Sequence, residues 1–458
     1  MSGASAPTAI DVLVVGGGSA ALCAALAARR RGATVRLLEQ APISFRGGNS
    51  RHARNFRLMH DEAQWYVPDS YGEAAFLRDL HRVTAGATDE ALARLLIRGS
   101  ASIAPWLQDN GVALQDPGSG VMPHSKRTAF FLGGGKAMIN ALYATAEAIG
   151  VEIGYDSEVV ALHVEDARCS EVVVARDGGA ERIAAKAVVL ACGGQQSDRG
   201  WLRAHFGAIA DGLVIRGTPY VTGRVLRLLL DAGARAVGDP AQAHIVAVDA
   251  RGPEVDGGIV TRITAIPYGI VVDRNAKRFH DEGEDARKTH YARWGARIAQ
   301  CERQTAYLIM DAAGRARALP TALPPIEADS IAGLAAKLEL DPQALQATVA
   351  SFNAAVREGG GTEALTPPKS HGAKPLTAPP FAAYPMRPGL TFTHFGVAVD
   401  QTMRVLTTGD ECLGNVFAAG MIMAANVLGR GYLAGLGVTL SAVFGRLAGE
   451  EAARHAAR

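Results

Sequence analysis

The sequence has little that would indicate a metal centre, a secreted protein or a membrane-spanning protein. Its five cysteines are scattered and never stand in Cys-x-x-Cys spacing, so no iron–sulfur, zinc or other metal site is expected and a reduced, cytoplasmic setting is favoured. The N-terminal residues lack a charged region followed by an apolar core, which argues against a signal peptide. No apolar run approaches the roughly 18 residues of a membrane span.

Strong charge of either sign is also missing. The net charge of +2 provides no bulk field that would attract nucleic acid, so no nucleic-acid partner is expected. Hydrophobic residues make up 48% of the chain and charged residues 20%, which is ordinary for a globular enzyme. The 458 residues suffice for two or three domains with a large core.

Glycine, in contrast, is plentiful, and the chain is organised around a glycine turn in residues 11–39. An apolar strand is predicted over Asp11–Val15, a helix over Ala20–Arg30 and a second strand over Thr34–Leu38, with Glu39 at its end. The turn between the first strand and the helix has the spacing Gly16-x-Gly18-x-x-Ala21. This order of strand, glycine turn, helix, strand and acid is typical of a dinucleotide-binding unit.

Each part of that unit has a physical role. Gly16 and Gly18 let the backbone approach a pyrophosphate, and the free N–H groups at the start of the helix hold its charge. Glu39 lies where a carboxylate accepts hydrogen bonds from both ribose hydroxyls of an adenosine, which favours FAD or NAD over NADP. An ordinary glycine-rich βαβ turn is the alternative.

The rest of the chain reads as a second domain inserted into the first. A buried strand over residues 187–194 ends in another Gly-Gly pair, and the flavin-type pattern returns after about residue 376. Between them the composition changes, with a strongly charged stretch and proline-rich breaks. We therefore predict an α/β fold whose Rossmann-like domain, residues 1–244 and 376–458, is split by an α+β domain at 245–375.

Several short motifs, taken in their order and spacing, resemble one family over nearly the whole chain. The motifs AVVLACGG (187–194), QAH (242–244), GIVVDRNAKRF (269–279), NVFAAG (415–420) and FGRLAGEEAA (444–453) are similar to those of fumarate reductase and succinate dehydrogenase flavoproteins. Three further motifs look more narrowly like FAD-dependent tricarballylate dehydrogenase: RGGNSRHARNFR (46–57), FFLGGGKA (130–137) and GRGYLAGLG (429–437).

The resemblance implies FAD as the cofactor and a mobile capping domain that covers the substrate. The FAD is expected to be non-covalent, because relatives with a covalent bond carry a histidine just before the Gly-Gly pair, where this chain has Ser44, Phe45 and Arg46. The expected cofactor-binding residues are Gly16, Gly18, Ser19, Ala20, Glu39, Gln40, Gly47, Gly48, Asn49, Ser50, Val159, Ala191, Gly193, Gly194, Gly420, Gly435 and Leu436.

The implied reaction removes two hydrogens from a CH–CH unit beside carboxylates, a hydride to flavin N5 and a proton to a base. Carboxylates need bidentate cationic partners, which arginine supplies best. Arg430 stands about two sequence positions from the place where the family has an arginine that binds the substrate. Arg51, Arg54 and Thr393 are further candidates for substrate binding. Arg51 and Arg54 also fit a solvated helix face, which is the structural alternative.

The candidates for proton transfer are histidines, one arginine and one lysine. The resemblance implies that His244 binds substrate and that Arg287 takes the proton, although a one-residue offset leaves Lys288 and His290 as rivals. A further family histidine falls at Phe392, and Thr391, Thr393 and His394 around it are together the expected substitute. Imidazole titrates near neutrality, whereas a guanidinium stays charged unless its surroundings favour the neutral form.

The expected function is the oxidation of tricarballylate to cis-aconitate, with electrons passed to a separate membrane-bound iron–sulfur protein. The protein would then be cytoplasmic or peripheral at the inner face of the membrane. Two alternatives remain open: a flavin dehydrogenase or reductase of another dicarboxylate or of a ring substrate, and a flavin electron-transfer module with no substrate of its own.

Overall fold

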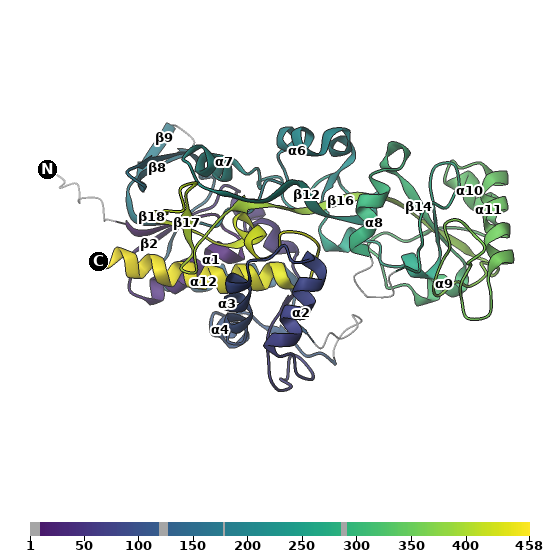
Figure 1. Ribbon diagram of the computed structural model, residues 1–458, viewed down its shortest axis with the longest axis horizontal. Helices are drawn as coiled ribbons and strands as arrows, with labels where there is room; N and C mark the ends of the chain where they lie inside the picture. Colours follow the sequence, from purple (N-terminus) through teal and green to yellow (C-terminus); the bar gives the residue numbers. More distant parts are fainter. Residues whose placement is uncertain (1–9, 119–126, 177–178, 285–290) are drawn as a thin grey trace. The chain divides into compact units, whose positions relative to one another are not determined.

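The computed structural model describes residues 10–118, 127–176, 179–284 and 291–458, shown as a ribbon in Figure 1. The chain forms two compact units. The first unit contains residues up to Asp198, Thr218–Ala243 and Phe392–Arg458. The second unit contains Arg199–Gly217 and His244–Thr391.

A six-stranded sheet is the centre of the first unit, and it confirms the predicted glycine turn. The strand order is β17-β18-β10-β1-β2-β6, and β1 pairs in parallel with both β2 and β10. Only β17 pairs antiparallel, at the edge. The strands are β1 (Ile10–Val15), β2 (Val35–Leu38), β6 (Glu152–Gly154), β10 (Ala185–Leu190), β17 (Arg404–Leu406) and β18 (Cys412–Ala418).

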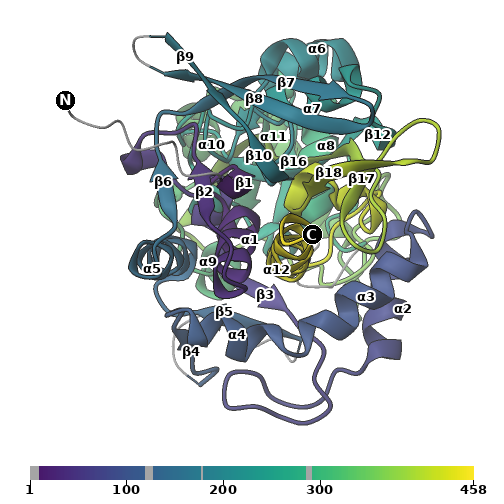
Figure 2. The same cartoon turned by 90° about the vertical axis from the view of Figure 1, so that its left-hand side faces the viewer.

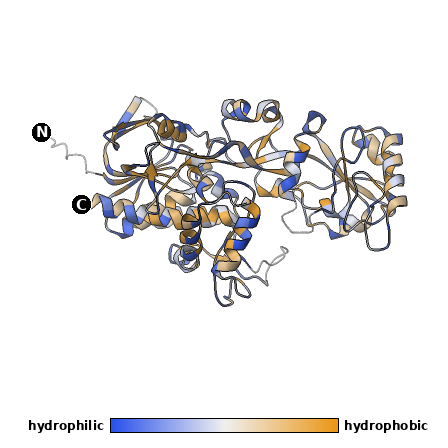
Figure 3. Ribbon diagram, in the orientation of Figure 1, coloured by the Kyte–Doolittle hydropathy of each residue, from blue (hydrophilic) through white to orange (hydrophobic). Residues whose placement is uncertain are grey.

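Helices α1 (Ser19–Arg30) and α12 (Leu436–Ala456) pack against each other beside this sheet, as Figure 2 shows. Glycines in α12 make the close approach possible: a Cβ on Gly445 would lie 2.4 Å from a carbonyl oxygen of α1, and one on Gly449 2.1 Å from another. Helix α1 is buried over most of its length because it is rich in alanine and leucine. Figure 3 shows α12 becoming more hydrophilic toward its C-terminus. This packing fixes the N-terminus of α1 beside the glycine turn.

The remaining elements of the first unit surround the sheet. Two small antiparallel sheets contain β3 (Asn55–Arg57), β4 (Leu114–Gln115), β5 (Thr128–Phe131), β7 (Glu158–Glu165), β8 (Arg168–Arg176) and β9 (Gly179–Ile183). The helices are α2 (Glu73–Thr84), α3 (Glu90–Ser100), α4 (Ile103–Asp109), α5 (Gly134–Ala148) and α7 (Arg224–Asp231).

The second unit is built on its own sheet, with none of its described strands in the six-stranded sheet. The order is β11-β16-β14-β13, and β12 and β15 also pair with β16. The strands are β11 (Val214–Ile215), β12 (Ala236–Asp249), β13 (Ile270–Val272), β14 (Ala306–Met310), β15 (Ile326–Ala328) and β16 (Phe381–Val397). The helices are α6 (Arg199–Phe206), α8 (Tyr291–Ile298), α9 (Ala312–Arg317), α10 (Ile331–Lys337) and α11 (Pro342–Ala355).

The limits of the second unit differ from the boundaries expected at 245 and 375 in two places. The unit extends to Thr391 because β16, which begins after the expected boundary, pairs with β14 and β15. It also gains Arg199–Gly217, since β11 in that segment pairs with β16 at Val214 and Gly389. Proline-rich composition marked a break in the sequence, but the hydrogen-bonded strands set where the unit ends.

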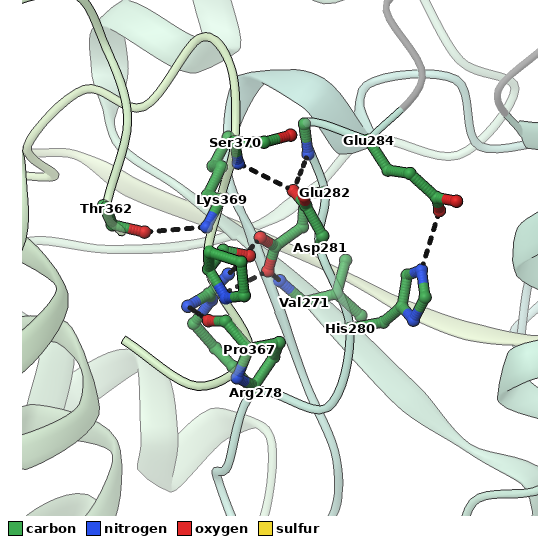
Figure 4. A network of polar contacts seen from close by, with 12 residues as sticks. Val271, Arg278, His280, Asp281, Glu282, Glu284, Thr362, Pro367, Lys369 and Ser370 are labelled. Carbon is green, nitrogen blue, oxygen red and sulfur yellow. Dashed lines mark hydrogen bonds and ion pairs between the residues drawn. The ribbon is translucent and has the colours of Figure 1, made fainter. Parts of the chain in front are cut away.

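A buried charge network lies inside the second unit (Figure 4). The Arg278 guanidinium donates to both carboxylate oxygens of Glu282, at 3.0 and 2.6 Å, and Glu282 also accepts the Val271 N–H at 2.8 Å. The Lys369 ammonium donates to two backbone carbonyls at 2.7 and 2.9 Å. Burial lowers the pKa of Lys369 to about 8. Arg278 and Glu282 thus form a buried structural ion pair.

Candidate functional site

A cavity opens in the first unit where β1, β2 and β10 end. Its walls come from chain segments that are far apart in sequence, because the carboxyl ends of parallel strands meet at one edge of a sheet. The lining residues are Val15–Ala20, Leu38–Ala41, Gly48–Ser50, Ser157, Val159, Ala191–Gly193, Gln196, Thr218, Tyr220–Val225, Met421 and Ser441.

The two motif glycines have different roles at this cavity. Gly16 has φ +114°, and a Cβ there would lie 2.5 Å from the Ala191 carbonyl oxygen, so glycine is required for the chain to fold. Gly18 has φ −78°, and the atom nearest to its Cβ would be Ser50 Oγ at 3.5 Å. Gly18 therefore leaves space in front of the N-terminus of α1, where backbone N–H groups favour an anion.

Glu39 stands at the end of β2 and is 5% exposed. Its carboxylate accepts the backbone N–H groups of Ala41 at 3.0 Å and Gly47 at 3.2 Å. Burial raises the pKa of Glu39, and these hydrogen bonds oppose that rise. The Gln40 N–H and the Tyr143 hydroxyl also hydrogen-bond this carboxylate, which holds it in place at the end of β2.

One polar atom in the cavity wall calls for a ligand. Gln196 is 1% exposed, and its Oε1 has no hydrogen-bond partner among the described residues. Nearby, Asn49 Oδ1 accepts the Thr218 N–H at 3.0 Å and ties two lining segments together. A buried acceptor of this kind is rare in native proteins unless a ligand or water meets it. Together with the space at Gly18, it fits a cavity made for a dinucleotide.

Most of the expected cofactor residues line this cavity. Those that do are Gly16, Gly18, Ser19, Ala20, Glu39, Gln40, Gly48, Asn49, Ser50, Val159, Ala191 and Gly193. Gly47 and Gly194 lie just behind the wall: Gly47 donates to Glu39, and a Cβ on Gly194 would be 2.9 Å from Gln196 Oε1.

The remaining expected residues, Gly420, Gly435 and Leu436, lie outside the lining. A Cβ on Gly420 would lie 2.7 Å from the Ala20 side chain, and a Cβ on Gly435 would lie 2.7 Å from the backbone nitrogen of Arg57. These glycines allow the chain itself to pack closely. Their neighbours Met421 and Ser441 line the cavity in their place.

The sequence did not predict that the segment after residue 217 would line the cavity. Thr218 and Tyr220–Val225 contribute a whole wall, although they carry no local motif that would mark them. These residues belong to the first unit, whereas residues 199–217 before them belong to the second unit. The one local signal was the Thr222-Gly223 pair before α7, where Gly223 has φ +69°.

His394 is buried in the first unit with 3% exposure. Its Nδ1 lies 3.0 Å from the Leu428 carbonyl oxygen, so Nδ1 carries the proton and Nε2 keeps its lone pair. Burial lowers the pKa of His394 to about 4, which leaves the ring neutral at pH 7. Its edge-to-face contact with Phe392, at 5.3 Å between centroids, holds the ring orientation.

The other proposed proton-transfer residues belong to the second unit. His244 is 4% exposed and begins that unit's long segment, within β12. Arg287, Lys288 and His290 lie outside the described residues. The roles of His244, Arg287 and His290 therefore stay predictions.

Three further residues were proposed to bind substrate, and none of them is among the lining residues of the cavity. Arg51 follows the lining residue Ser50 directly, and its guanidinium lies 5.1 Å from the centre of the Phe45 ring. Arg54 lies 5.8 Å from the centre of the Phe130 ring. Thr393 donates to Gln195 Oε1 at 3.1 Å.

Arg430 lies elsewhere in the first unit. It is exposed and lines a second hollow of about 1140 Å³, together with Arg235, Asp89 and Asp239. It is not part of the wall of the cavity at α1. Its proposed role in holding a substrate carboxylate stays a prediction.

The comparisons with known proteins agree with the cavity. Residues 11–438 match the family described as "FAD binding domain". The chain belongs to that family. It is 28% identical over 473 residues to a probable fumarate reductase of Shewanella frigidimarina, covering 97% of this chain and 75% of the relative. It is 26% identical to the digoxin reductase of Eggerthella lenta, covering 97% and 87%.

Solved structures give the same fold. The open conformation of a flavocytochrome c3 fumarate reductase superposes with a TM-score of 0.81 at 26% identity, covering 99% of this chain and 79% of that one. A 3-ketosteroid-Δ4-(5α)-dehydrogenase of Rhodococcus jostii superposes with a TM-score of 0.75 at 23% identity, covering 99% and 98%. The second likeness shows the fold alone.

The protein is thus an FAD-dependent oxidoreductase that acts on CH–CH groups, with a mixed α/β flavoprotein fold in which a capping domain accompanies the FAD-binding domain. FAD supplies a two-electron acceptor or donor beside the substrate carbons. Among the described residues, no helix is both long and apolar enough to cross a bilayer.

Proposed function

We propose that the protein desaturates a small polycarboxylate, with tricarballylate as substrate and cis-aconitate as product. The observation that carries the proposal is the cationic segment that continues the cavity wall: Gly48, Asn49 and Ser50 line the cavity, and two arginines follow within four residues. Arginine binds carboxylates bidentately, and an apolar ring substrate would not need such a pair.

The proposed roles of the residues follow from their chemistry. Arg51 and Arg54 hold substrate carboxylates, and Arg430 is a third candidate for the same task. His394 accepts or donates a hydrogen bond as a neutral ring, since its pKa is about 4. His244 contributes a further hydrogen bond, and Arg287 takes the proton, with His290 as the rival. The second unit acts as the cap that excludes water from the reaction.

The proposal includes the fate of the cofactor and its electrons. FAD is held non-covalently, since Ser44, Phe45 and Arg46 offer no histidine before the Gly-Gly pair. The electrons pass to a separate membrane-bound iron–sulfur protein, and the enzyme works in the cytoplasm or at the inner face of the membrane.

Reduction of another unsaturated carboxylate or of a ring compound is the second candidate. It is favoured by the curated relatives, which include fumarate reductases and a digoxin reductase. A flavin electron-transfer module without a substrate is the third possibility, and the second unit with its own sheet speaks against it.

Anaerobic titration of the purified flavoprotein separates these functions. We expect added tricarballylate to bleach the flavin band and yield cis-aconitate, whereas succinate and a 3-ketosteroid leave the band unchanged. Bleaching by succinate or the steroid alone would replace the proposed substrate. No bleaching by any of them, together with reoxidation of reduced flavin by fumarate, would assign the enzyme to reduction.

The arginines can be tested in the same assay. Arg51→Met should raise the KM for tricarballylate by about tenfold to hundredfold, because a charge-assisted bidentate contact is lost. Arg98→Met is the control, since Arg98 forms an exposed ion pair with Glu73 in the same unit. An unchanged KM in the Arg51 variant would favour the solvated-face interpretation.

A further inference from the structure

We propose that Gln196 binds the isoalloxazine ring of FAD through the ring's imide edge, where N3–H lies between two carbonyl oxygens. Family membership establishes FAD, but no motif in the sequence marks Gln196. The inference starts from its position in the cavity wall and from its buried Oε1, which no donor in the described part of the chain meets.

The sheet topology places Gln196 at the flavin end of the cavity. In the order β10-β1-β2, Glu39 follows β2 and Gln196 follows β10, on opposite sides of the Gly16–Gly18 turn after β1. With the adenosine ribose at Glu39 and the pyrophosphate at the N-terminus of α1, the remaining part of FAD extends toward β10.

A second observation supports the placement of Gln196 at the flavin end of the cavity. A Cβ on Gly194 would lie 2.9 Å from Gln196 Oε1 and 3.0 Å from Thr393 Oγ1, so both oxygens lie beside Gly194. Thr393 precedes the buried His394, the candidate for substrate chemistry. Gln196 therefore stands on the side of the cavity where the redox-active ring is needed.

The chemistry of the amide selects the group that it binds. An open, buried acceptor requires a donor, and the donors at this end of FAD are N3–H and the ribityl hydroxyls. A primary amide presents an acceptor and a donor in one plane. This geometry matches N3–H and an adjacent carbonyl of the planar ring, whereas a single hydroxyl would use only half of it. Reversing the oxygen and nitrogen of the amide leaves the two-point match intact.

Gln195 provides a matched contrast. It is equally buried, and its Oε1 accepts the Thr393 hydroxyl at 3.1 Å, but it does not line the cavity. Gln195 Nε2, like Gln196 Oε1, has no partner in the described part of the chain, so the two adjacent glutamines differ in position: Gln196 lines the cavity and Gln195 does not.

The test compares FAD with 3-methyl-FAD, in which a methyl group replaces the N3 hydrogen. Apoprotein is titrated with each flavin and binding is followed by fluorescence quenching. Wild type should bind FAD about tenfold more tightly than 3-methyl-FAD. Gln196→Leu and Gln196→Met should lose most of that preference and shift the visible band of bound FAD. Gln195→Leu should keep both.

Each outcome decides the matter. Loss of the N3 preference in both Gln196 variants, with the preference kept in the Gln195 variant, supports the proposal. A full N3 preference in the Gln196 variants overturns it, and weaker FAD binding beside that full preference would place Gln196 on the ribityl chain instead. Circular dichroism on each apoprotein restricts the comparison to folded variants, and two Gln196 substitutions guard against failure of one.

Discussion

Two regions of this molecule bury polar groups equally deeply and treat them in opposite ways. In the second unit, Arg278 and Glu282 satisfy each other, and further Arg278 donors reach the carbonyls of Pro367 and Pro368. In the first unit, the acceptor of Gln196 has no partner within the described chain. The Arg278–Glu282 pair is matched and holds the fold, whereas the unmatched acceptor of Gln196 belongs to a residue in the wall of a cavity, which marks it as a place for a ligand.

The largest effect should come from breaking the matched region. Glu282→Leu leaves the Arg278 charge buried without its partner, and we expect a loss of about 3–5 kcal/mol in the free energy of unfolding. Urea denaturation followed by circular dichroism measures it. FAD affinity of the folded fraction should stay unchanged, because neither residue lines the cavity.

An exposed ion pair provides the control for that variant. Glu90 and Arg94 pair on α3 at 2.7 Å with half or nearly half of each side chain exposed, so Glu90→Leu should cost less than about 1 kcal/mol. Equal losses of unfolding free energy in the two variants would mean that the buried ion pair stabilises the protein no more than the exposed one.

The next effect concerns the pH dependence of stability at His394. Its pKa is about 4 in the folded protein and about 6.5 in the unfolded chain, so the unfolded state binds more protons between these values. Stability from this residue is fully present above pH 6.5 and is lost as the pH falls toward 4, by about 3 kcal/mol.

Urea denaturation at a series of pH values compares the wild type with His394→Gln. The stability difference between the two proteins should shift in favour of the variant as the pH is lowered through that window. Parallel curves would show that the ring is not held neutral in the fold.

A smaller effect is expected at Glu39. Glu39→Gln places an amide N–H group where the carboxylate accepts backbone N–H groups and ribose hydroxyls, so FAD affinity should fall by about tenfold. Isothermal titration of the apoprotein measures it. Glu181→Gln is the control, since Glu181 pairs with Arg36 outside the cavity wall. The same affinity loss in both variants would remove Glu39 from the ribose site.

The sequence predicted those parts of the fold whose signal is local. The glycine turn with Glu39 depends on neighbours within a few residues, and the structure has it. The limits of the second unit depend instead on pairing between β11 and β16, which lie far apart in the chain. Composition cannot reveal that pairing.

The candidate site shows the same difference between residues with a local sequence signal and residues placed by the tertiary structure. Most of the cofactor residues that belong to motifs line the cavity, while Gln196 and the wall at 218–225 carry no motif and are placed by tertiary structure. Arg430 shows the converse: its motif suggested a role in substrate binding, but a motif does not determine which hollow the residue lines.

Gly18→Val tests most directly that the open region is the FAD site. Gly18 has an ordinary backbone conformation and no close neighbour at its Cβ, so a side chain fills only the space reserved for pyrophosphate. Gly72→Val is the matched control, because Gly72 precedes α2 with a similar backbone conformation and open surroundings. We predict that FAD titration gives full binding in the wild type and the Gly72 variant, and at least about a hundredfold weaker binding in a folded Gly18 variant. A Gly18 variant that purifies with full flavin occupancy would contradict this account.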